Sequence, residues 1–342
     1  MSADPAAPAT PPLPRRTREV READEFRHLA PVATKAADSR GRDHDEAEDR
    51  YRTAFERDRD RILHSKAFRR LKHKTQVFLN PDGDHFVTRL THTLQVAQVG
   101  RSIACALGLN EPLTEAICLG HDIGHAPFGH TGEDALTPYV DGGWQHAIHG
   151  VRVVEVLEPL NLTAEVRDGI SQSSWRNDPP PFTPEGWICR FADRIAYLAH
   201  DAQDAMRAGV LESDDIPVHI RSLFGPPGRA WIDSMVGMVV DASVEAGHVT
   251  MRPDELASMT ELRTWMFDHV YLRPVARRQA ERGVRVIRDL VEWYAERPEQ
   301  IPDPYRLPES SDLRAAVDWV AGMSDKFAIR MHDERFRPAG LY

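Results

Sequence analysis

Two histidines and an adjacent aspartate occupy the inward faces of two expected helices. His92 stands at helical spacing from the apolar residues that follow it, and His121 stands at helical spacing from those that precede it, with Asp122 directly after it. A single histidine on an apolar face is usually a satisfied core residue. Two on neighbouring helices, one followed by a carboxylate that is costly to bury alone, favour a metal site.

A third expected helix carries a polar stripe within an otherwise apolar sequence. Asp193, Tyr197 and Asp201 follow one another at intervals of four residues, which places them on one face. With a rise of about 1.5 Å per residue, the stripe spans roughly 12 Å. A nucleotide has a similar length from its α-phosphate to the far side of its sugar. A stripe that simply meets solvent is the alternative, which a tyrosine between two acids fits poorly.

The ligand types indicate which ions the site would bind. Two imidazoles (His92 and His121) and two carboxylates (Asp122 and Asp193) suit a hard-to-borderline divalent ion. We expect one such ion, Mg or Mn first, with Fe, Co, Ni and Zn as alternatives. An ion of this kind with open positions can polarise a phosphate group and lower the pKa of water.

A chain that is helical almost throughout would position these residues. We expect a helix from about 54 toward 78, the turn Asn80–Gly83, a helix over 87–107 that Gly108 ends, and a helix that Asn110 caps. The long helix with the polar stripe should cover 187–207. Further helical stretches are expected near 229–246, 254–281, 283–296 and 312–331. No alternating run is long enough to predict a sheet.

The domain organisation follows from these stretches. Five prolines in the first fourteen residues, followed by dense mixed charge, predict a disordered or extended tail over residues 1–48. A helical core should cover 49–210, and the additional helices of 211–342 should pack on it. The fold class that we predict is all-α.

Composition excludes several classes of protein. No apolar run approaches a membrane span, and the N-terminus lacks a secretory pattern, so we expect a cytoplasmic protein without a membrane partner. Three cysteines without metal-type spacing are expected to be small core residues. The net charge of −10 argues against general nucleic-acid binding. The basic run Lys66–Lys74 could still hold a phosphate group or simply be a solvated helix face.

The order of these motifs resembles a known family. The pattern His92, His121–Asp122 and Asp193 resembles the HD-domain metal phosphohydrolases, and the surrounding sequence is similar to their bacterial dGTPase-like deoxynucleoside triphosphate triphosphohydrolases. The segments that carry this resemblance are Arg57–Ser65, Phe68–Leu71, Lys74–Phe78, Arg89–His92, His121–His130, Ala192–Tyr197 and Val320–Asp325.

The resemblance implies an activity and a set of site residues. The activity is cleavage of a dNTP, such as dGTP, to the deoxynucleoside and tripolyphosphate. Family members form tetramers or hexamers, and some are activated by a nucleotide at a second site. The positions that match the family's catalytic and substrate-binding residues are His130, Glu133 and His146, and Gln76, Arg89, Arg194, Tyr197 and Asp201. The spacing of His130 and Glu133 independently lets the carboxylate orient the imidazole.

The sequence also departs from the family's pattern near the expected pocket. Relatives usually have His-Asn-x-Gln where this chain has His146-Ala147-Ile148-His149. They also usually carry a histidine near the position of Ser173, where this chain has none. These departures bear on nucleotide preference. Three alternatives stay open: an HD-type 5′-nucleotidase or phosphodiesterase, a nucleotide-binding regulatory protein with weak activity, and a nucleic-acid-binding protein.

Overall fold

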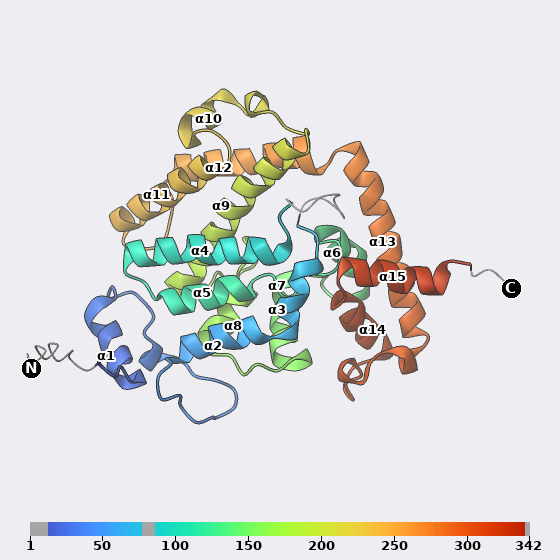
Figure 1. The fold of residues 1–342 in the computed structure, drawn as a ribbon, viewed down its shortest axis with the longest axis horizontal. Helices are drawn as coiled ribbons and strands as arrows, with labels where there is room; N and C mark the ends of the chain where they lie inside the picture. The colour runs from blue at the N-terminus through green and yellow to red at the C-terminus, as the bar shows by residue number, and fades with distance from the viewer. Residues whose placement is uncertain (1–12, 77–85, 339–342) are drawn as a thin grey trace, which may run out of the picture.

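The prediction of an all-α protein is confirmed. The computed structural model describes residues 13–76 and 86–338, except the side chains of 275 and 276, and within these ranges it contains fifteen α-helices and no β-sheet (Figure 1). A single antiparallel bridge between Thr75 and Thr88 is the β-type contact that these ranges contain. No helix of the described residues is long and apolar enough to cross a membrane.

The first of two hydrophobic clusters lies among the central helices. Its fully buried members include Val99, Ile117 and Ile195. Apolar residues at helical spacing on each of these helices bury one face against the neighbouring helix. The helices are α2 (Ala54–His64), α4 (Arg89–Leu107), α5 (Glu111–Gly120), α8 (Ala164–Ser171), α9 (Pro184–Arg207), α11 (Arg229–Ala246) and α12 (Pro253–Met266).

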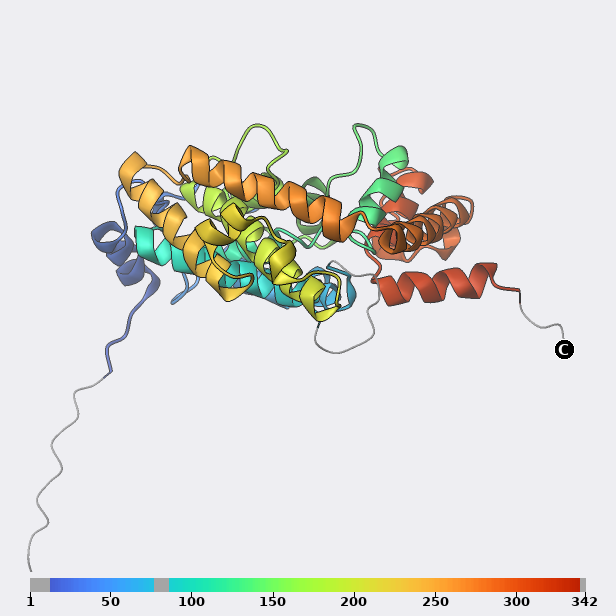
Figure 2. The ribbon, with the colours of Figure 1, turned by 90° about the horizontal axis from the view of Figure 1, so that it is seen from above.

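The second hydrophobic cluster lies at one end of the molecule. There α13 (Pro274–Ala295), α14 (Asp312–Ala321) and α15 (Asp325–Phe336) pack with the short helix α6 (His130–Leu136), as Figures 1 and 2 show. The helices α6 and α13 are far apart in sequence but adjacent in space. The remaining helices are α1 (Arg18–His28), α3 (Lys66–Arg70), α7 (His146–Arg152) and α10 (Val218–Phe224).

Local signals end the helices that carry the site. Asn110 accepts a hydrogen bond from the Leu113 backbone N–H at 3.1 Å and so caps α5, as predicted. Gly108 ends α4 with a φ of 64°, a left-handed conformation that favours glycine. These two caps separate α4 from α5 by only a few residues, so the two helices pack side by side.

Three predicted helices are broken where sequence periodicity alone would continue them. The helix expected from 54 toward 78 ends at Ser65, whose hydroxyl accepts from the Phe68 N–H at 3.0 Å and starts α3. The break expected before Gly283 lies instead before Pro274, because proline cannot continue a helix. The stretch 312–331 is interrupted between α14 and α15. The turn expected at 80–83 lies outside the described residues.

The N-terminal segment from residue 13 onward is packed on the core. It contains α1, and Thr34 donates its N–H and hydroxyl to Glu185 of α9 at 3.1 and 2.7 Å. Arg42 pairs with Asp58, whose side chain is fully buried. The described part of the segment predicted as a disordered or extended tail, residues 13–48, thus contains a helix and supplies partners to buried carboxylates of the core. The boundaries at 49 and 210 stay a prediction.

Candidate metal centre and substrate pocket

Three helices of the first cluster bring three of the predicted metal ligands together. His92 lies on α4, His121 directly follows α5, and Asp193 lies on α9; the three helices pack against one another. His92 Nε2 lies 3.1 Å from Asp193 Oδ1, and His121 Nε2 lies 3.6 Å from the same oxygen. Their donor atoms are close enough to bind one ion.

Asp122, the fourth predicted ligand, lies beside this group. His121 Nε2 is 3.3 Å from Asp122 Oδ1, and His92 Nε2 is 3.9 Å from Asp122 Oδ2. The residues His92, His121 and Asp122 are buried. The structure thus brings all four predicted ligands together, although their ligand roles stay a prediction.

The protonation of His121 fits a metal ligand. Its Nδ1 lies 2.6 Å from the Cys118 carbonyl oxygen, so Nδ1 carries the proton and donates it there. Nε2 is then the atom left to face the carboxylates of Asp122 and Asp193, and it is buried without a hydrogen-bond partner among the described residues. A lone pair and two anions are stable together only around a cation or a proton. A metal-ligating histidine usually has this second hydrogen bond to a carbonyl.

The charges around His121 support the same interpretation. Burial lowers the pKa of His121, but the Asp122 and Asp193 carboxylates outweigh burial and raise it to about 10. Burial in turn raises the pKa of Asp193, but His121 and His92 hold it below its usual range. The cluster therefore attracts positive charge, and its nitrogen and oxygen donors fit a divalent ion.

Glu133 lies among three histidines next to the predicted metal ligands. Glu133 Oε1 lies 2.7 Å from His125 Nδ1, 2.9 Å from His146 Nδ1 and 3.6 Å from His130 Nδ1. His146 ring-stacks on His125 at 3.9 Å, while His130 is three-quarters exposed. The expected pairing of His130 with Glu133 is therefore longer than a hydrogen bond, and His125 and His146 are the closer partners of Glu133.

Electrostatics favour an ion pair between Glu133 and His146. Burial lowers the pKa of His146, but the Glu133 carboxylate raises it above its ordinary value. Burial and the nearby Arg89 lower the pKa of His125 to about 4, so this ring is neutral. A charged imidazole beside a neutral one gives the pocket both a proton donor and a proton acceptor.

A glycine allows this arrangement of histidines. A Cβ atom on Gly124 would lie 2.1 Å from the His146 carbonyl oxygen and 2.3 Å from the Gly150 backbone nitrogen. Only a residue without a side chain lets the loop after His121 approach the first turn of α7 this closely. The contact places His146 against His125.

The predicted polar stripe on α9 is present, and its far end has an unexpected partner. The Tyr271 hydroxyl donates to Asp201 Oδ2 at 2.6 Å, while Asp201 Oδ1 is buried without a hydrogen-bond partner among the described residues. The Gln76 side-chain oxygen is likewise buried and unpartnered. Burial raises the pKa of Asp201 to about 8. A buried polar oxygen that is free in this position is available to a hydroxyl group of a ligand.

Two cations lie along this stripe without carboxylate partners. Arg194 packs over the Trp175 ring at 4.2 Å, and Arg263 of α12 packs over Phe267 at 4.7 Å; within the described chain neither forms an ion pair. Arg263 acts electrostatically on Arg194 and on Tyr197, which lies midway along the stripe. Arg89, by contrast, donates from Nη1 to Asp122 Oδ2 at 2.7 Å.

Comparison with known proteins agrees with this geometry. The HD domain model matches residues 89–198, and the model of the Phosphohydrolase-associated domain matches 249–334. A protein of Caldanaerobacter subterraneus named Deoxyguanosinetriphosphate triphosphohydrolase-like protein is 46% identical over 92% of this chain and 94% of its own length. The chain belongs to the HD-domain dGTPase-like family.

Other relatives carry the same name. The proteins of Desulfatibacillum aliphaticivorans and Clostridium perfringens are each 41% identical and cover 93% and 91% of this chain, and 97% and 94% of their own lengths. HD domains are metal-dependent, and the family is one of metal-dependent hydrolases. The matched HD region, 89–198, contains His92, His121, Asp122 and Asp193.

The three positions that depart from the family's pattern, Ala147, His149 and Ser173, are all buried, and His149 lies beside α14. Ala147 is buried, and Ser173 is buried with its hydroxyl bonded to the Ile170 carbonyl oxygen at 2.9 Å, so neither offers a free polar group. His149 is buried against Trp144, with ring centroids 4.2 Å apart, and its Nδ1 lies 3.9 Å from Asp318 of α14. His149 therefore belongs to the contact between α7 and α14.

Sequence reasoning missed several residues of the candidate site. His125 could have been found, since it follows Asp122 by three residues in the same motif. Tyr271 and Arg263 lie far along the chain, in a segment without a distinctive pattern, and only packing of α12 on α9 brings them to the stripe. The basic run also divides: Lys74 is buried, whereas Lys66, Arg69 and Lys72 are exposed, as a solvated face would be.

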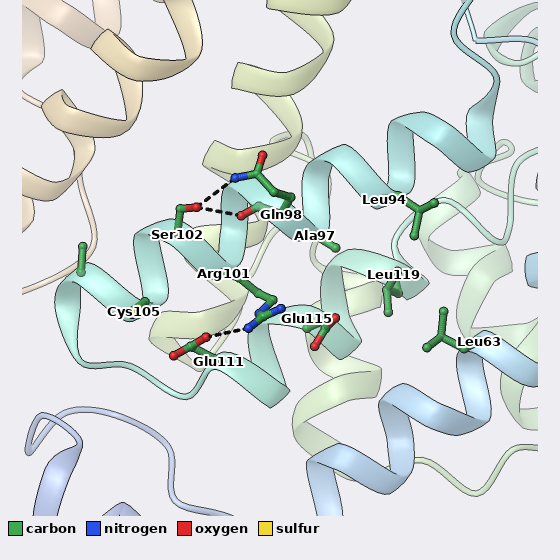
Figure 3. Close-up of a pocket in the computed structure, with 11 residues that line it drawn as sticks. Leu63, Leu94, Ala97, Gln98, Arg101, Ser102, Cys105, Glu111, Glu115 and Leu119 are labelled. Carbon is green, nitrogen blue, oxygen red and sulfur yellow. Dashed lines mark hydrogen bonds and ion pairs between the residues drawn. The ribbon is translucent and has the colours of Figure 1, made fainter. Parts of the chain in front are cut away.

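A surface groove of about 680 Å³ lies elsewhere on the HD domain. Figure 3 shows it on the outer side of α4 and α5, with the Arg101–Glu111 pair at 3.2 Å and the Gln98–Ser102 hydrogen bond at 3.0 Å. Its charged side chains pair with one another or with neighbours, and it contains no histidine. It is separate from the metal centre, which faces the opposite side of α4.

Proposed function

We propose that this protein hydrolyses deoxynucleoside triphosphates, dGTP or several dNTPs, to the deoxynucleoside and tripolyphosphate. The observation that supports this most is the stripe on α9. It begins at Asp193 in the metal centre and ends at the unpartnered Oδ1 of Asp201, two helical turns or roughly 12 Å away. A nucleotide whose α-phosphate lies at the metal would present its 3′-hydroxyl to that oxygen.

Each group has a role in this reaction. His92, His121, Asp122 and Asp193 would hold one divalent ion, which supplies Lewis-acid polarisation of a phosphate oxygen. Arg194 and Arg263, which have no carboxylate partners in the described part of the chain, would bind the remaining phosphate charge. Asp201 and Gln76 would form hydrogen bonds with the sugar hydroxyl, with Tyr197 packed along the nucleotide.

The histidines around Glu133 would move the proton. Water attacks the α-phosphorus, the bond from phosphorus to the 5′-oxygen breaks, and the leaving oxygen takes up a proton. Glu133 holds His146 as its charged partner at 2.9 Å, so His146 or the exposed His130 can donate that proton, and neutral His125 can accept one. The electrons of the broken bond stay on the 5′-oxygen, which becomes the 5′-hydroxyl.

Identification of the phosphate product tests the proposal. The purified protein would be incubated with each dNTP and Mg²⁺ or Mn²⁺, and the products separated by ion-exchange chromatography. Tripolyphosphate with deoxynucleoside is expected. Orthophosphate from a nucleoside monophosphate, with no tripolyphosphate from any dNTP, would instead assign the protein to the HD-type 5′-nucleotidases. Binding without turnover would favour the regulatory protein.

A further inference from the structure

The loop between α5 and α6 carries His125 and leads into His130, yet it has no regular secondary structure to hold it. Phe128, near its end, has a φ of 64°, a conformation that is unfavourable for a residue with a side chain. Such strain persists only where the surrounding structure enforces it. The contacts that enforce this turn come from the other end of the chain.

Asp325, the first residue of α15, bonds two distant segments at once. Its Oδ1 accepts from the Phe128 backbone N–H at 3.0 Å, and its Oδ2 accepts from the Thr75 N–H at 2.8 Å and from the Thr75 hydroxyl. The carboxylate is 95% buried. Charged acceptors of buried N–H groups form strong hydrogen bonds.

Lys74 adds a second connection beside the first. Its ammonium group donates to the His125 carbonyl oxygen and, at 3.2 Å, to that of Ala321 at the end of α14. The side chain is buried. Three segments, 74–75, 125–128 and 321–325, are thus joined through two buried side chains of opposite charge.

The connection continues toward the metal centre. The Thr75 carbonyl oxygen accepts from Arg89 Nε at 3.2 Å, and Arg89 Nη1 donates to Asp122 Oδ2 at 2.7 Å. Gln76 directly follows Thr75. Movement of Thr75 would therefore alter the environment of Asp122 and the place of Gln76.

We propose that Asp325 is a positioning residue. Together with Lys74 it joins the loop between α5 and α6 to the C-terminal helices α14 and α15, and these helices thereby set the geometry of that loop. Asp325 holds the strained turn before His130 and fixes Thr75 beside Gln76. The catalytic part of this inference rests on the proposed dNTP hydrolysis, whereas the structural part does not. His92 and Asp193 lie on α4 and α9, and His121 and Asp122 directly follow α5, ahead of the segment 125–128 that Asp325 and Lys74 contact. The predicted ligands should therefore keep their ion when the contact is lost.

Asp325→Asn tests this role with little change in volume. Asparagine offers one acceptor oxygen, so the Phe128 or the Thr75 N–H loses its partner. We expect hydrogen exchange, followed by mass spectrometry, to accelerate in 123–130 or 74–76 by at least about tenfold, as loss of one hydrogen bond to a charged group implies. Metal content should stay at the wild-type value, and kcat should fall by up to about 10²-fold.

The control and the second variant separate the outcomes. Asp333→Asn, on the exposed side of the same helix, should leave exchange and kcat unchanged. Thr75→Val keeps the N–H but loses the hydroxyl contact with Asp325, so it should accelerate exchange and lower kcat less than Asp325→Asn does. It is the test variant if Asp325→Asn does not fold. In both variants the preference for deoxy over dideoxy substrates, measured as the ratio of their kcat/KM values, should fall, because displaced Gln76 no longer contacts the 3′-hydroxyl. General destabilisation of the fold would not change this ratio.

Unchanged exchange in both loops of Asp325→Asn would overturn the inference. Faster exchange with unchanged kcat would overturn the catalytic role of the contact. If the wild-type protein released no tripolyphosphate, the proposed function would fail, and exchange alone would still decide whether Asp325 holds the loop.

Discussion

The oxygen of Asp193 lies between two imidazoles, and this arrangement determines what its removal does. Asp193→Ala leaves His92 and His121 without the shared carboxylate at 3.1 and 3.6 Å. We expect the variant to lose its metal on dialysis, measured by elemental mass spectrometry. Asp241→Ala, an exposed change on α11, should keep full occupancy. Wild-type metal content in Asp193→Ala would show that the ion, if bound, is held elsewhere.

The buried carboxyl group of Asp201 should make stability depend on pH. Its folded-state pKa of about 8 lies above the unfolded value of about 4. Between these values the folded protein keeps a proton that the unfolded chain releases, so its free energy of unfolding falls as pH rises. Asparagine does not titrate, so in Asp201→Asn this decrease in the free energy of unfolding with rising pH is absent. The variant should gain on the wild type by up to about 1.4 kcal/mol per pH unit in urea unfolding between pH 5 and 8. Parallel curves would contradict the burial of an unpaired Asp201.

At the level of single elements, α9 connects the candidate metal centre at Asp193 with Asp201, where we propose that the sugar binds. If Asp201 Oδ1 bonds the 3′-hydroxyl of the substrate, a substrate without that hydroxyl leaves this buried oxygen unpaired. We expect 2′,3′-dideoxynucleotides to be much poorer substrates than dNTPs, and Asp201→Ala to narrow the difference in kcat/KM. Equal hydrolysis of both classes by the wild type would rule out this placement of the nucleotide along α9.

The N-terminal cap of α5 is a second element that supports the site. Asn110 is buried, accepts from Leu113 at the start of α5 and donates to the Thr34 carbonyl oxygen at 2.9 Å. Asn110→Ala removes both bonds and should lower the free energy of unfolding by about 1–3 kcal/mol in urea titration. Thr17→Ala, at the start of α1, removes no capping bond and should have little effect. Similar losses in the two variants would mean that the cap is unimportant.

For the molecule as a whole, the N-terminal segment completes the core. Arg42 is the ion-pair partner of Asp58, which is fully buried and also accepts from the Thr163 N–H at 2.8 Å. Arg42→Met should lower the free energy of unfolding by about 3–5 kcal/mol, because it leaves a buried charge unpaired. Thermal unfolding would measure this against Arg40→Met, which loses a packing contact over Phe182 and an electrostatic attraction to Asp168 but leaves no fully buried charge unpaired. A loss no larger than that of Arg40→Met would show that the segment contributes little.

The sequence by itself determined the helical class and the principal residues of the candidate metal centre. Helical spacing requires only local geometry, so His92, His121 and the stripe from Asp193 to Asp201 could be assigned to inward faces before any contact was known. The caps Gly108 and Asn110 could also be predicted, because a cap depends only on residues next to it in the sequence. The helix break at Ser65 and the docking of residues 13–48 were not, since a buried acid such as Asp58 acquires its partner only when the chain folds.

Tertiary structure alone decided which residues complete the site. Spacing pairs His130 with Glu133, but the folded chain brings His125 and His146 closer to that carboxylate, because Gly124 lets the loop approach α7. Likewise, Tyr271 and Asp325 reach the pocket from segments 70 and 197 residues away from their bonding partners. Contacts across such separations depend on helix packing, which periodicity within one helix does not specify.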